Sequence, residues 1–387
     1  MKKALLTATV MHHFTSFHLP LIDLLHEHGY EVHAAAHDAM GGPVREQLEA
    51  AVDRLYDLPF ARSPLDPSNR AAYRQLKQLI DETDYDVIHC NTPMGGFLTR
   101  LAARRARKNG TVVIYTAHGF HFYQGASRLN WLLIYPVEKL FGRLWSDCLI
   151  TICDEDEKTA REHKICRSVR RIHGAGAKAE RFAPISEEER LALRDELGFG
   201  PDDVLCLCTG ELNANKNQKQ LVAAAAQVVE ACPSFYLLCA GSGDTEQALR
   251  EQIESLGLQD HVRLLGYRTD VERFVRVSDF VASVSCREGL GVNLIEGMIC
   301  AKPAVATRNR GHSELVADGV SGLLVPIGDV DATAKAMLQL AEQPALRQKM
   351  GLAAKERSAA YTTQNVMREM ESIYHEFVFD RQDQKKG

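Results

Sequence analysis

Two glutamates eight positions apart, Glu288 and Glu296, bracket a glycine-rich turn. Gly289 and Gly291 allow a tight turn, and the apolar spacing from Val292 to Ala301 predicts a helix after it. A helix N-terminus binds anions because its first N–H groups have no partner within the helix and its dipole favours negative charge. A diphosphate on these amides, with the two carboxylates hydrogen-bonded to hydroxyl groups on either side of it, fits a nucleotide sugar.

A lysine stands in a second loop of the same kind. Lys216 follows a predicted strand at 204–209, in an Asn-rich loop that leads into the helix expected from Gln218. An ammonium group here can neutralise a leaving diphosphate; the alternative is a solvated loop lysine. No carboxylate pair at metal-ligand spacing accompanies it, so we expect chemistry that needs no metal and no cofactor beyond the nucleotide sugar as co-substrate.

Strands and helices must position these loops. The first half alternates predicted strands with helix-forming segments, and the second half restarts the same pattern. The strands expected are 4–9, 31–35, 54–58, 86–90, 111–116, 148–152, 204–209, 234–240, 261–266, 279–285, 302–307 and 322–325. Such alternation predicts an α/β protein with parallel sheets. A glycine- and alanine-rich passage at 173–179 marks the linker, so the domains expected are 1–180 and 181–362, followed by a helix and tail at 363–387.

Composition excludes several classes of protein. A chain of 387 residues with 45% hydrophobic and 25% charged residues is ordinary globular protein of two domains. Its net charge of −5 argues against nucleic acid as a partner. The ten cysteines have no C-x-x-C pair, which favours reduced thiols in the cytoplasm. The apolar stretch at 131–135 is far too short to cross a membrane.

Four motifs in order carry a family resemblance. They are the segments 116–119 (TAHG), 209–217 (TGELNANKN), 285–297 (SCREGLGVNLIEG) and 319–326 (GVSGLLVP). The chain resembles the retaining glycosyltransferases of family 4, and the segment 116–139 is similar to enzymes of capsule and exopolysaccharide assembly. The resemblance implies the GT-B fold, which has two facing Rossmann-like domains and a terminal helix that returns to the first domain.

The resemblance also implies roles for individual residues on the donor side. Glu288 would contact donor-sugar hydroxyls near the reacting carbon, and Glu296 would bind the ribose hydroxyls. Backbone groups of Gly289, Leu290, Asn293 and Leu294 would bind the diphosphate. Apart from the resemblance, Tyr267 and Arg268 follow the predicted strand 261–266, and the backbone there is a candidate for recognition of the base. His118 follows the predicted strand 111–116 and would face the donor sugar; the alternative is a structural histidine.

Other residues are expected on the acceptor side. We place His13 and His18, after the first strand, on an acceptor-side surface, with a purely structural reading left open. Arg100, Arg104, Arg107 and Lys108 fall on one predicted helix face. This face could hold anionic lipid headgroups, and the apolar segment 131–135 supports peripheral contact with an anionic membrane. A solvated basic face is the alternative.

One position departs from the family pattern. Glu211 stands where the commonest pattern has an arginine. A carboxylate beside a diphosphate would repel it, so either Glu211 points elsewhere or another cation, Arg268 or Arg287, takes over the role.

The function expected from the sequence is therefore that of a retaining, metal-independent glycosyltransferase. It would move a hexose or N-acetylhexosamine from a UDP-linked donor to a lipid-linked or polysaccharide acceptor in capsule or exopolysaccharide assembly. Two alternatives stay open. A sugar-nucleotide 2-epimerase shares the architecture and the donor, and an inactive donor-binding scaffold would bind the nucleotide without turnover.

Overall fold

The computed structural model describes residues 1–123 and 125–380, and the chain divides into two compact units. Unit 1 comprises Met1–Gly176 and the segment from Thr363 onward, and unit 2 comprises Ala177–Thr362. The first division lies four residues before the boundary expected at 180. Each unit is a parallel sheet covered by helices, which confirms the α/β class with two Rossmann-like domains. The expected polar tail at 381–387 lies outside the described residues.

Unit 1 contains a seven-stranded parallel sheet with the order β3-β2-β1-β4-β5-β6-β7. The strands are β1 (Lys2–Val10), β2 (Tyr30–His37), β3 (Arg54–Asp57), β4 (Val87–Asn91), β5 (Val112–Ala117), β6 (Cys148–Thr151) and β7 (Val169–Arg171). The strand order reverses between β1 and β4. Ligands of open α/β sheets bind beyond the carboxyl ends of the strands at such a point.

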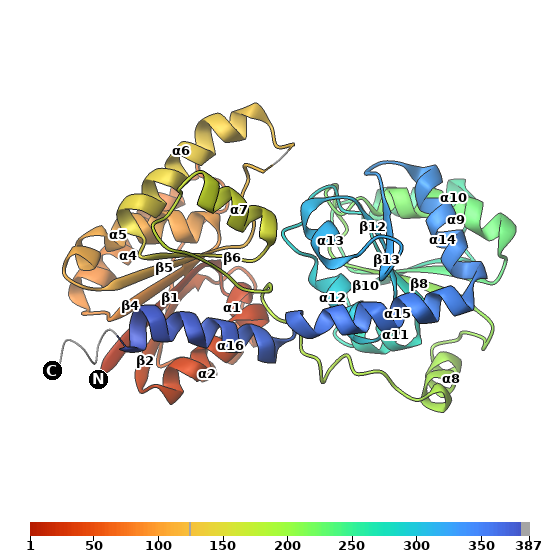
Figure 1. The fold of residues 1–387 in the computed structure, drawn as a ribbon, viewed down its shortest axis with the longest axis horizontal. Coiled ribbons are helices and arrows are strands. Elements are labelled where there is room, and N and C mark those ends of the chain that lie inside the picture. Colours follow the sequence, from red (N-terminus) through yellow and green to blue (C-terminus); the bar gives the residue numbers. More distant parts are fainter. Residues whose placement is uncertain (124, 381–387) are drawn as a thin grey trace. The chain divides into compact units, whose positions relative to one another are not determined.

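Helices cover both faces of this sheet (Figure 1). They are α1 (His12–Phe17), α2 (Leu19–Glu27), α3 (Gly42–Ala51), α4 (Ser68–Glu82), α5 (Pro93–Lys108), α6 (Arg128–Trp145), α7 (Asp154–Glu162) and α16 (Thr363–Tyr374), which continues as a π-helical turn (His375–Phe379). Helices α4, α5 and α6 lie on one face, and α2 and α16 lie on the other.

The C-terminal segment completes unit 1. The Tyr374 hydroxyl lies 2.8 Å from Nδ1 of His89, which is fully buried on β4. Near the start of the helix, Glu369 accepts a hydrogen bond from the His173 backbone N–H at 2.8 Å. The side chains that α16 and the π-helical turn bury form part of the unit 1 core, so this segment is an integral layer of the unit.

Unit 2 contains a six-stranded parallel sheet with the order β10-β9-β8-β11-β12-β13. The strands are β8 (Val204–Thr209), β9 (Phe235–Ala240), β10 (Val262–Gly266), β11 (Phe280–Ser283), β12 (Ala304–Thr307) and β13 (Gly322–Val325). The helices are α8 (Glu187–Glu196), α9 (Gln218–Ala231), α10 (Glu246–Ser255), α11 (Val271–Val277), α12 (Val292–Ile299), α13 (Arg310–Leu315), α14 (Val330–Glu342) and α15 (Pro344–Ser358), with a 3-10 turn at Ala359–Tyr361. The order reverses between β8 and β11.

The strands form where apolar residues run continuously, since a sheet with helices on both faces buries both sides of each central strand. Every residue of β4, β5, β11 and β12 is buried. The strand β7 was not expected, because a three-residue strand with two arginines carries no apolar run. Among the described residues, no helix is long and apolar enough to cross a membrane.

Candidate functional site

The glycine-rich turn and the helix after it lie where the order of the unit 2 sheet reverses. The chain leaves β11, turns through Gly291 with a φ of +103°, and enters α12. A side chain at Gly311 would come within 2.8 Å of the Leu290 backbone, so the start of α13 packs directly on this turn. The glycines are therefore required by a left-handed backbone and a close approach. The N-terminus of α12 is held by tight backbone packing.

Glu288 lies in this turn and is held by two partners. Its Oε1 accepts a hydrogen bond from the Ser285 hydroxyl at 2.8 Å and forms an ion pair with the Lys216 ammonium. Burial opposes ionisation of this carboxyl, but the Lys216 charge and the two hydrogen bonds outweigh it and hold the pKa of Glu288 below its usual value. Glu288 is therefore an ionised carboxylate at neutral pH.

Lys216 reaches Glu288 because its loop is tied to the loop after β11. The Asn215 side chain donates to the Arg287 carbonyl at 3.0 Å, and the Cys286 N–H donates to the Asn215 carbonyl at 2.7 Å. The Lys216 N–H is itself bonded to Asn213 Oδ1 at 2.9 Å. The loops that follow β8 and β11, the two strands at the reversal of the sheet order, thus bring the predicted lysine and glutamate together.

The Gly241-Ser242-Gly243 segment supports the lysine loop. A side chain at Gly241 would lie 1.9 Å from the Gly210 carbonyl oxygen, and one at Gly243 would lie 2.1 Å from that of Leu212. The Leu212 N–H also donates to the Ser242 carbonyl at 3.0 Å. The two glycines therefore allow the backbone of the lysine loop to rest directly on this segment.

Glu296 lies on α12 and is half-buried. Its carboxylate forms no hydrogen bond or ion pair with any of the residues that the structure describes. Burial is the main effect on this carboxyl and raises its pKa to about 7; the Arg181 charge opposes the shift and the Glu272 charge adds to it. A carboxyl with unused hydrogen-bonding capacity, one turn into the helix, is free to accept hydrogen bonds from ligand hydroxyl groups.

The other predicted donor-side residues fall into different environments. Leu290 and Leu294 are buried, and the Leu294 N–H already donates to the Gly291 carbonyl at 3.0 Å. In this conformation the first helical turn uses the Leu294 N–H, so its contact with a diphosphate stays a prediction. Asn293 donates its side chain to the Thr209 carbonyl at 3.1 Å, which ties α12 to the end of β8.

The loop predicted to recognise the base is exposed. Tyr267 is 72% exposed, and the Arg268 guanidinium is paired with Asp270 through bonds of 2.8 and 2.6 Å. Glu211 is also exposed, and its carboxylate accepts a bond from Asn213 at 3.0 Å. Of the two cations proposed to replace the family arginine, Arg268 is thus engaged by its own neighbour.

Two residues near Glu288 were not among the predicted site residues. Arg310, at the start of α13, donates Nε to the Glu288 carbonyl at 3.2 Å and so places a guanidinium beside the turn. His312 is fully buried, and its Nε2 has no partner among the described residues. Burial lowers the pKa of His312 to about 4. Both follow β12, and the repeated strand-to-loop pattern at 302–312 was the available signal.

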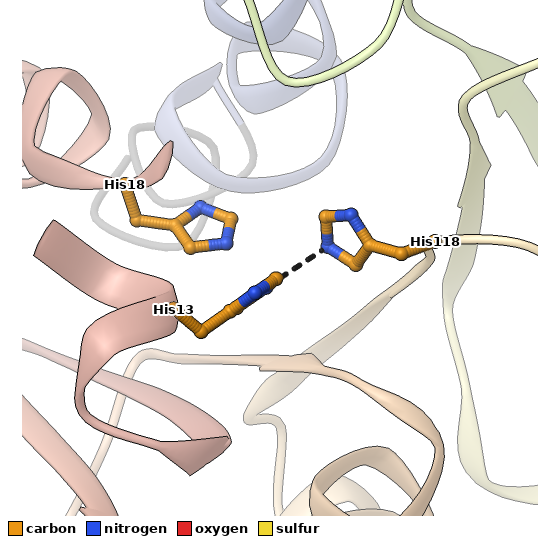
Figure 2. Close-up of side chains that lie close together, drawn as sticks. All are labelled: His13, His18 and His118. Carbon is orange, nitrogen blue, oxygen red and sulfur yellow. Dashed lines mark hydrogen bonds between the residues drawn. The ribbon is translucent and has the colours of Figure 1, made fainter. Parts of the chain in front are cut away.

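His118 lies at the carboxyl end of β5 in unit 1, next to two other histidines (Figure 2). Its Nε2 is 3.2 Å from His13 Nε2 and 3.2 Å from the Asn91 side-chain oxygen. His13 is half-buried, whereas His18 is only 5% exposed. The expectation that His18 forms an acceptor-side surface is wrong, because its imidazole packs against His13 and His118.

The predicted basic face on α5 is also only partly present. Arg100 is 1% exposed, pairs with Glu138 of α6 and stacks 3.9 Å above the Tyr115 ring. Arg107 pairs with Asp147 at 2.8 Å. Arg104 and Lys108 are exposed. Arg100 cannot hold a lipid headgroup, because its guanidinium is buried against α6.

The sequence of this chain matches two family models. Residues 20–175 match Glycosyltransferase Family 4, and residues 189–357 match Glycosyl transferases group 1. The chain is also 44% identical over 378 residues to the putative glycosyltransferase EpsD of Bacillus subtilis (strain 168), a match that covers 97% of each protein. The chain belongs to the family 4, group 1 glycosyltransferases.

Further relatives of this glycosyltransferase differ in detail. It is 23% identical over 309 residues, 79% of each chain, to the Escherichia coli UDP-Gal:alpha-D-GlcNAc-diphosphoundecaprenol alpha-1,3-galactosyltransferase. Its fold is similar to the crystal structure of Anabaena HepE in complex with UDP and glucose, with a TM-score of 0.78 and 20% identity over 97% of this chain and 100% of that one. This likeness confirms the GT-B fold.

Proposed function

We propose that this glycosyltransferase transfers a sugar from a UDP-linked donor, with retention of anomeric configuration and without a metal ion, to a lipid-linked or polysaccharide acceptor in exopolysaccharide assembly. The single observation that carries the proposal is the Lys216–Glu288 pair beside the N-terminus of α12. One ammonium, one carboxylate and a set of helix N–H groups lie together there. These are the groups that a diphosphate and the sugar attached to it require.

In this proposal the donor separates the pair. Its diphosphate takes the Lys216 ammonium and the N–H groups at the start of α12, while Glu288 accepts hydrogen bonds from sugar hydroxyls. Arg310 adds a second positive charge close to Glu288. Glu296, one turn into α12, accepts hydrogen bonds from the ribose hydroxyls. Removing one such charged bond costs about 1.5–3 kcal/mol, or roughly tenfold or more in affinity.

The reaction follows from the same groups. The bond between the sugar carbon and the diphosphate oxygen breaks, and both electrons leave with the UDP, whose charge Lys216 and the helix dipole stabilise. The acceptor hydroxyl forms the new bond on the same face of the sugar and gives its proton to the departing phosphate. His118 stabilises positive charge on the sugar. Fixed groups of this kind supply factors of about 10² to 10³ each.

The relatives support the choice of donor and acceptor. HepE was solved with UDP and with UDP-glucose. The Escherichia coli relative is named for a UDP-galactose donor and a diphosphoundecaprenol-linked acceptor. A diphosphoundecaprenol-linked acceptor carries a long hydrocarbon chain held in a membrane, so an enzyme that uses such an acceptor needs an apolar surface.

Helix α6 offers such a surface. The exposed side of this helix carries large apolar side chains, from Leu129, which is 60% exposed, to Leu144, which is 51% exposed. The members of this apolar stripe are Leu129, Leu132, Leu133, Ile134, Val137, Leu140 and Leu144. The stripe borders a groove of about 1200 Å³ between α4, α5 and α6. An apolar helix face of this kind binds to the surface of a membrane.

Exposed arginines support an anionic membrane as the partner of this surface. Arg62, Arg70 and Arg74 line the same groove and are exposed. Arg128 and Arg143 are exposed on α6 itself. Each such cation contributes about 1 kcal/mol near an anionic surface. We therefore place α6 at the inner face of the membrane, in peripheral contact, with the hydrocarbon chain of the acceptor against the stripe.

The test is a panel of UDP-, GDP- and ADP-sugars, with an undecaprenyl-diphosphate sugar as acceptor and a metal chelator present. The release of nucleoside diphosphate and the labelled product are followed for wild type, Glu288→Gln and Glu254→Gln. Glu254 is an exposed glutamate of α10, so its variant is the matched control. We expect turnover of one UDP-sugar by wild type and the control, and its loss in Glu288→Gln. Proton NMR of the product gives the anomeric configuration.

Other outcomes would contradict the proposal. Conversion of the donor to its 2-epimer without acceptor would show that the protein is a sugar-nucleotide 2-epimerase. Binding of UDP without turnover of any donor would show that the protein is an inactive donor-binding scaffold. Activity that the chelator abolishes would refute metal independence, and an inverted anomer would refute retention.

A further inference from the structure

Three histidines converge in unit 1 from segments far apart in the sequence (Figure 2). His13 lies on α1, His18 between α1 and α2, and His118 after β5. The ring centroid of His13 lies 4.9 Å from that of His18 and 4.6 Å from that of His118. One ring nitrogen of each residue lies within 4.8 Å of those of the other two. Three ligand atoms thus surround one small volume.

The unusual feature of this cluster is a nitrogen with no partner. His18 is 5% exposed, yet its Nε2 has no hydrogen-bond partner among the described residues. Such an atom lost its water on folding without gaining a replacement, which costs free energy. Because Figure 2 shows the His18 ring directed toward the other two rings, a ligand placed among the three would satisfy it.

The geometry is close to that of a metal site. In a tetrahedral zinc site with Zn–N bonds of about 2.0–2.1 Å, two ligand nitrogens lie about 3.3 Å apart. His13 Nε2 and His118 Nε2 already lie 3.2 Å apart. The His18 nitrogen lies within 4.8 Å of both and would have to move closer to complete the set. We propose that His13, His18 and His118 bind one transition-metal ion of the Zn²⁺ type.

The surroundings keep the three imidazoles neutral. Burial, together with the charges of the neighbouring histidines, holds the pKa of His13 and of His18 well below its usual value, and burial lowers that of His118 to about 4. Neutral imidazoles are the form that binds Zn²⁺, Cu²⁺ and Ni²⁺. Three histidine ligands leave a fourth position open. The Asn91 side-chain oxygen lies 3.2 Å from His118 Nε2.

The backbone of one ligand, His18, is held in place before any ion binds. The His18 N–H donates to the Phe14 carbonyl at 2.8 Å, and the His18 carbonyl accepts from Leu21 and Ile22, each at 3.1 Å. Little conformational freedom is therefore lost when the site fills. This ion has no part in neutralising the diphosphate, which is the work of Lys216 in unit 2.

The first experiment is a zinc titration of the full chain after removal of metals with a chelator. Calorimetry and competition with a coloured zinc chelator give stoichiometry and affinity. We expect one Zn²⁺ per chain in wild type and a loss of about 100-fold or more in affinity for His13→Gln and for His118→Gln, since even residues outside the ligand set change metal affinity 10- to 100-fold. Near-ultraviolet circular dichroism checks that the variants fold.

The chain supplies its own control. His28, Glu371 and His375 form a second three-ligand group, which is more exposed. The variant His375→Gln removes one of its ligands. We expect it to bind zinc as wild type does. Zinc binding lost in His375→Gln but kept in His13→Gln would overturn the proposal, as would the absence of one-to-one binding in wild type.

A spectroscopic measurement on wild type covers the case in which a variant fails to fold. X-ray absorption of the zinc-loaded chain counts the imidazole ligands directly. Three imidazoles support the site, and a shell of one imidazole with water or carboxylate oxygen refutes it.

An activity measurement separates this proposal from the proposed function on which it depends. If His118 stabilises charge on the donor sugar, bound Zn²⁺ removes its nitrogen from that role and inhibits transfer, and His13→Gln relieves the inhibition. Zinc bound by the three histidines without inhibition would leave the metal site intact and refute the role of His118.

Discussion

The Lys216 ammonium is ion-paired with the Glu288 carboxylate, although 72 positions separate them in the sequence. Each group therefore holds the other in place until a ligand separates them. We expect Lys216→Ala and Glu288→Gln each to lower kcat/KM for the donor by about 10²- to 10³-fold. Because the two act as a unit, the double variant should resemble the worse single variant. Losses that multiply in the double variant would show that the two act independently.

Glu296 should determine donor affinity more than turnover. Its carboxyl has no partner among the described residues and lies on the helix that we propose binds the diphosphate. We expect Glu296→Gln to weaken UDP binding about tenfold, because a hydrogen bond from a charged group contributes about 1.5–3 kcal/mol. Calorimetry with UDP and with uracil tests this. A change in UDP affinity matched by an equal change for uracil would assign Glu296 to the base instead of the ribose.

The same residue predicts a pH dependence of stability. Burial raises the pKa of Glu296 to about 7, above the usual glutamate value of 4.5. Between these values the folded chain holds a proton that the unfolded chain has released, so stability falls as pH rises from about 4.5 to 7. The loss is at most roughly 3 kcal/mol, since one pKa unit corresponds to about 1.4 kcal/mol.

Urea unfolding at pH 5 and pH 8 measures this loss. Glu296→Gln should remove this part of the difference between the two pH values, because its side chain does not titrate. An equal pH dependence in wild type and variant would show that Glu296 ionises normally in the folded chain.

Arg310 is the cation that we expect to take the place of the family arginine. It donates to the Glu288 carbonyl, whereas Arg268 is paired with Asp270. We expect Arg310→Ala to raise KM for the donor about tenfold, and Arg268→Ala to have a smaller effect. Steady-state kinetics separates the two. Arg308→Ala is the control, because Arg308 pairs with Asp318 on the surface. A larger effect from Arg268→Ala would reverse the assignment.

The buried Arg100–Glu138 pair should contribute to the stability of unit 1. Removing one partner leaves the other charge buried without compensation, which costs about 3–5 kcal/mol. We expect Glu138→Gln to destabilise by that order, and Arg104→Ala, an exposed position on the same helix, to change stability by about 0.5 kcal/mol or less. Thermal unfolding compares the two. Equal effects would mean that the pair is not buried in solution.

The apolar stripe on α6 should bind anionic vesicles. We expect wild type to sediment with vesicles that contain phosphatidylglycerol and not with phosphatidylcholine alone, and added salt to weaken the binding. Leu132→Glu, at a position that is 69% exposed, should reduce binding without loss of fold. Leu352→Glu in unit 2, 60% exposed, is the matched control. Binding that both substitutions reduce equally would exclude α6 as the specific contact.

Much of the fold could be predicted from the sequence, because fully buried parallel strands have short, continuous apolar sequences between the helices. All the strands expected in both halves are present, and the parallel order places the loops after β8 and β11 next to each other. The proximity of Lys216 and Glu288 was therefore foreseeable. The strand β7 was not, since its residues carry no apolar pattern.

The partners of individual side chains were harder to foresee. Arg100 looked like a surface residue because periodicity does not distinguish a solvated basic face from one that packs on another helix through a carboxylate. His18 looked exposed for a similar reason, since only the folded chain brings it against His118. The N–H of Leu294 is taken by the first turn of α12, and sequence gives the end of a helix only within a few residues.

The course of the chain affects how the protein can be made. Unit 1 requires a segment that begins at Thr363, after all of unit 2, and the bond between His89 and Tyr374 joins residues 285 positions apart. During synthesis the first 176 residues therefore emerge without their final layer, while unit 2 can fold as one continuous stretch. A chain that stops short of α16 would leave a strip of the first sheet uncovered and prone to aggregation, even though every residue of the donor site had already been made.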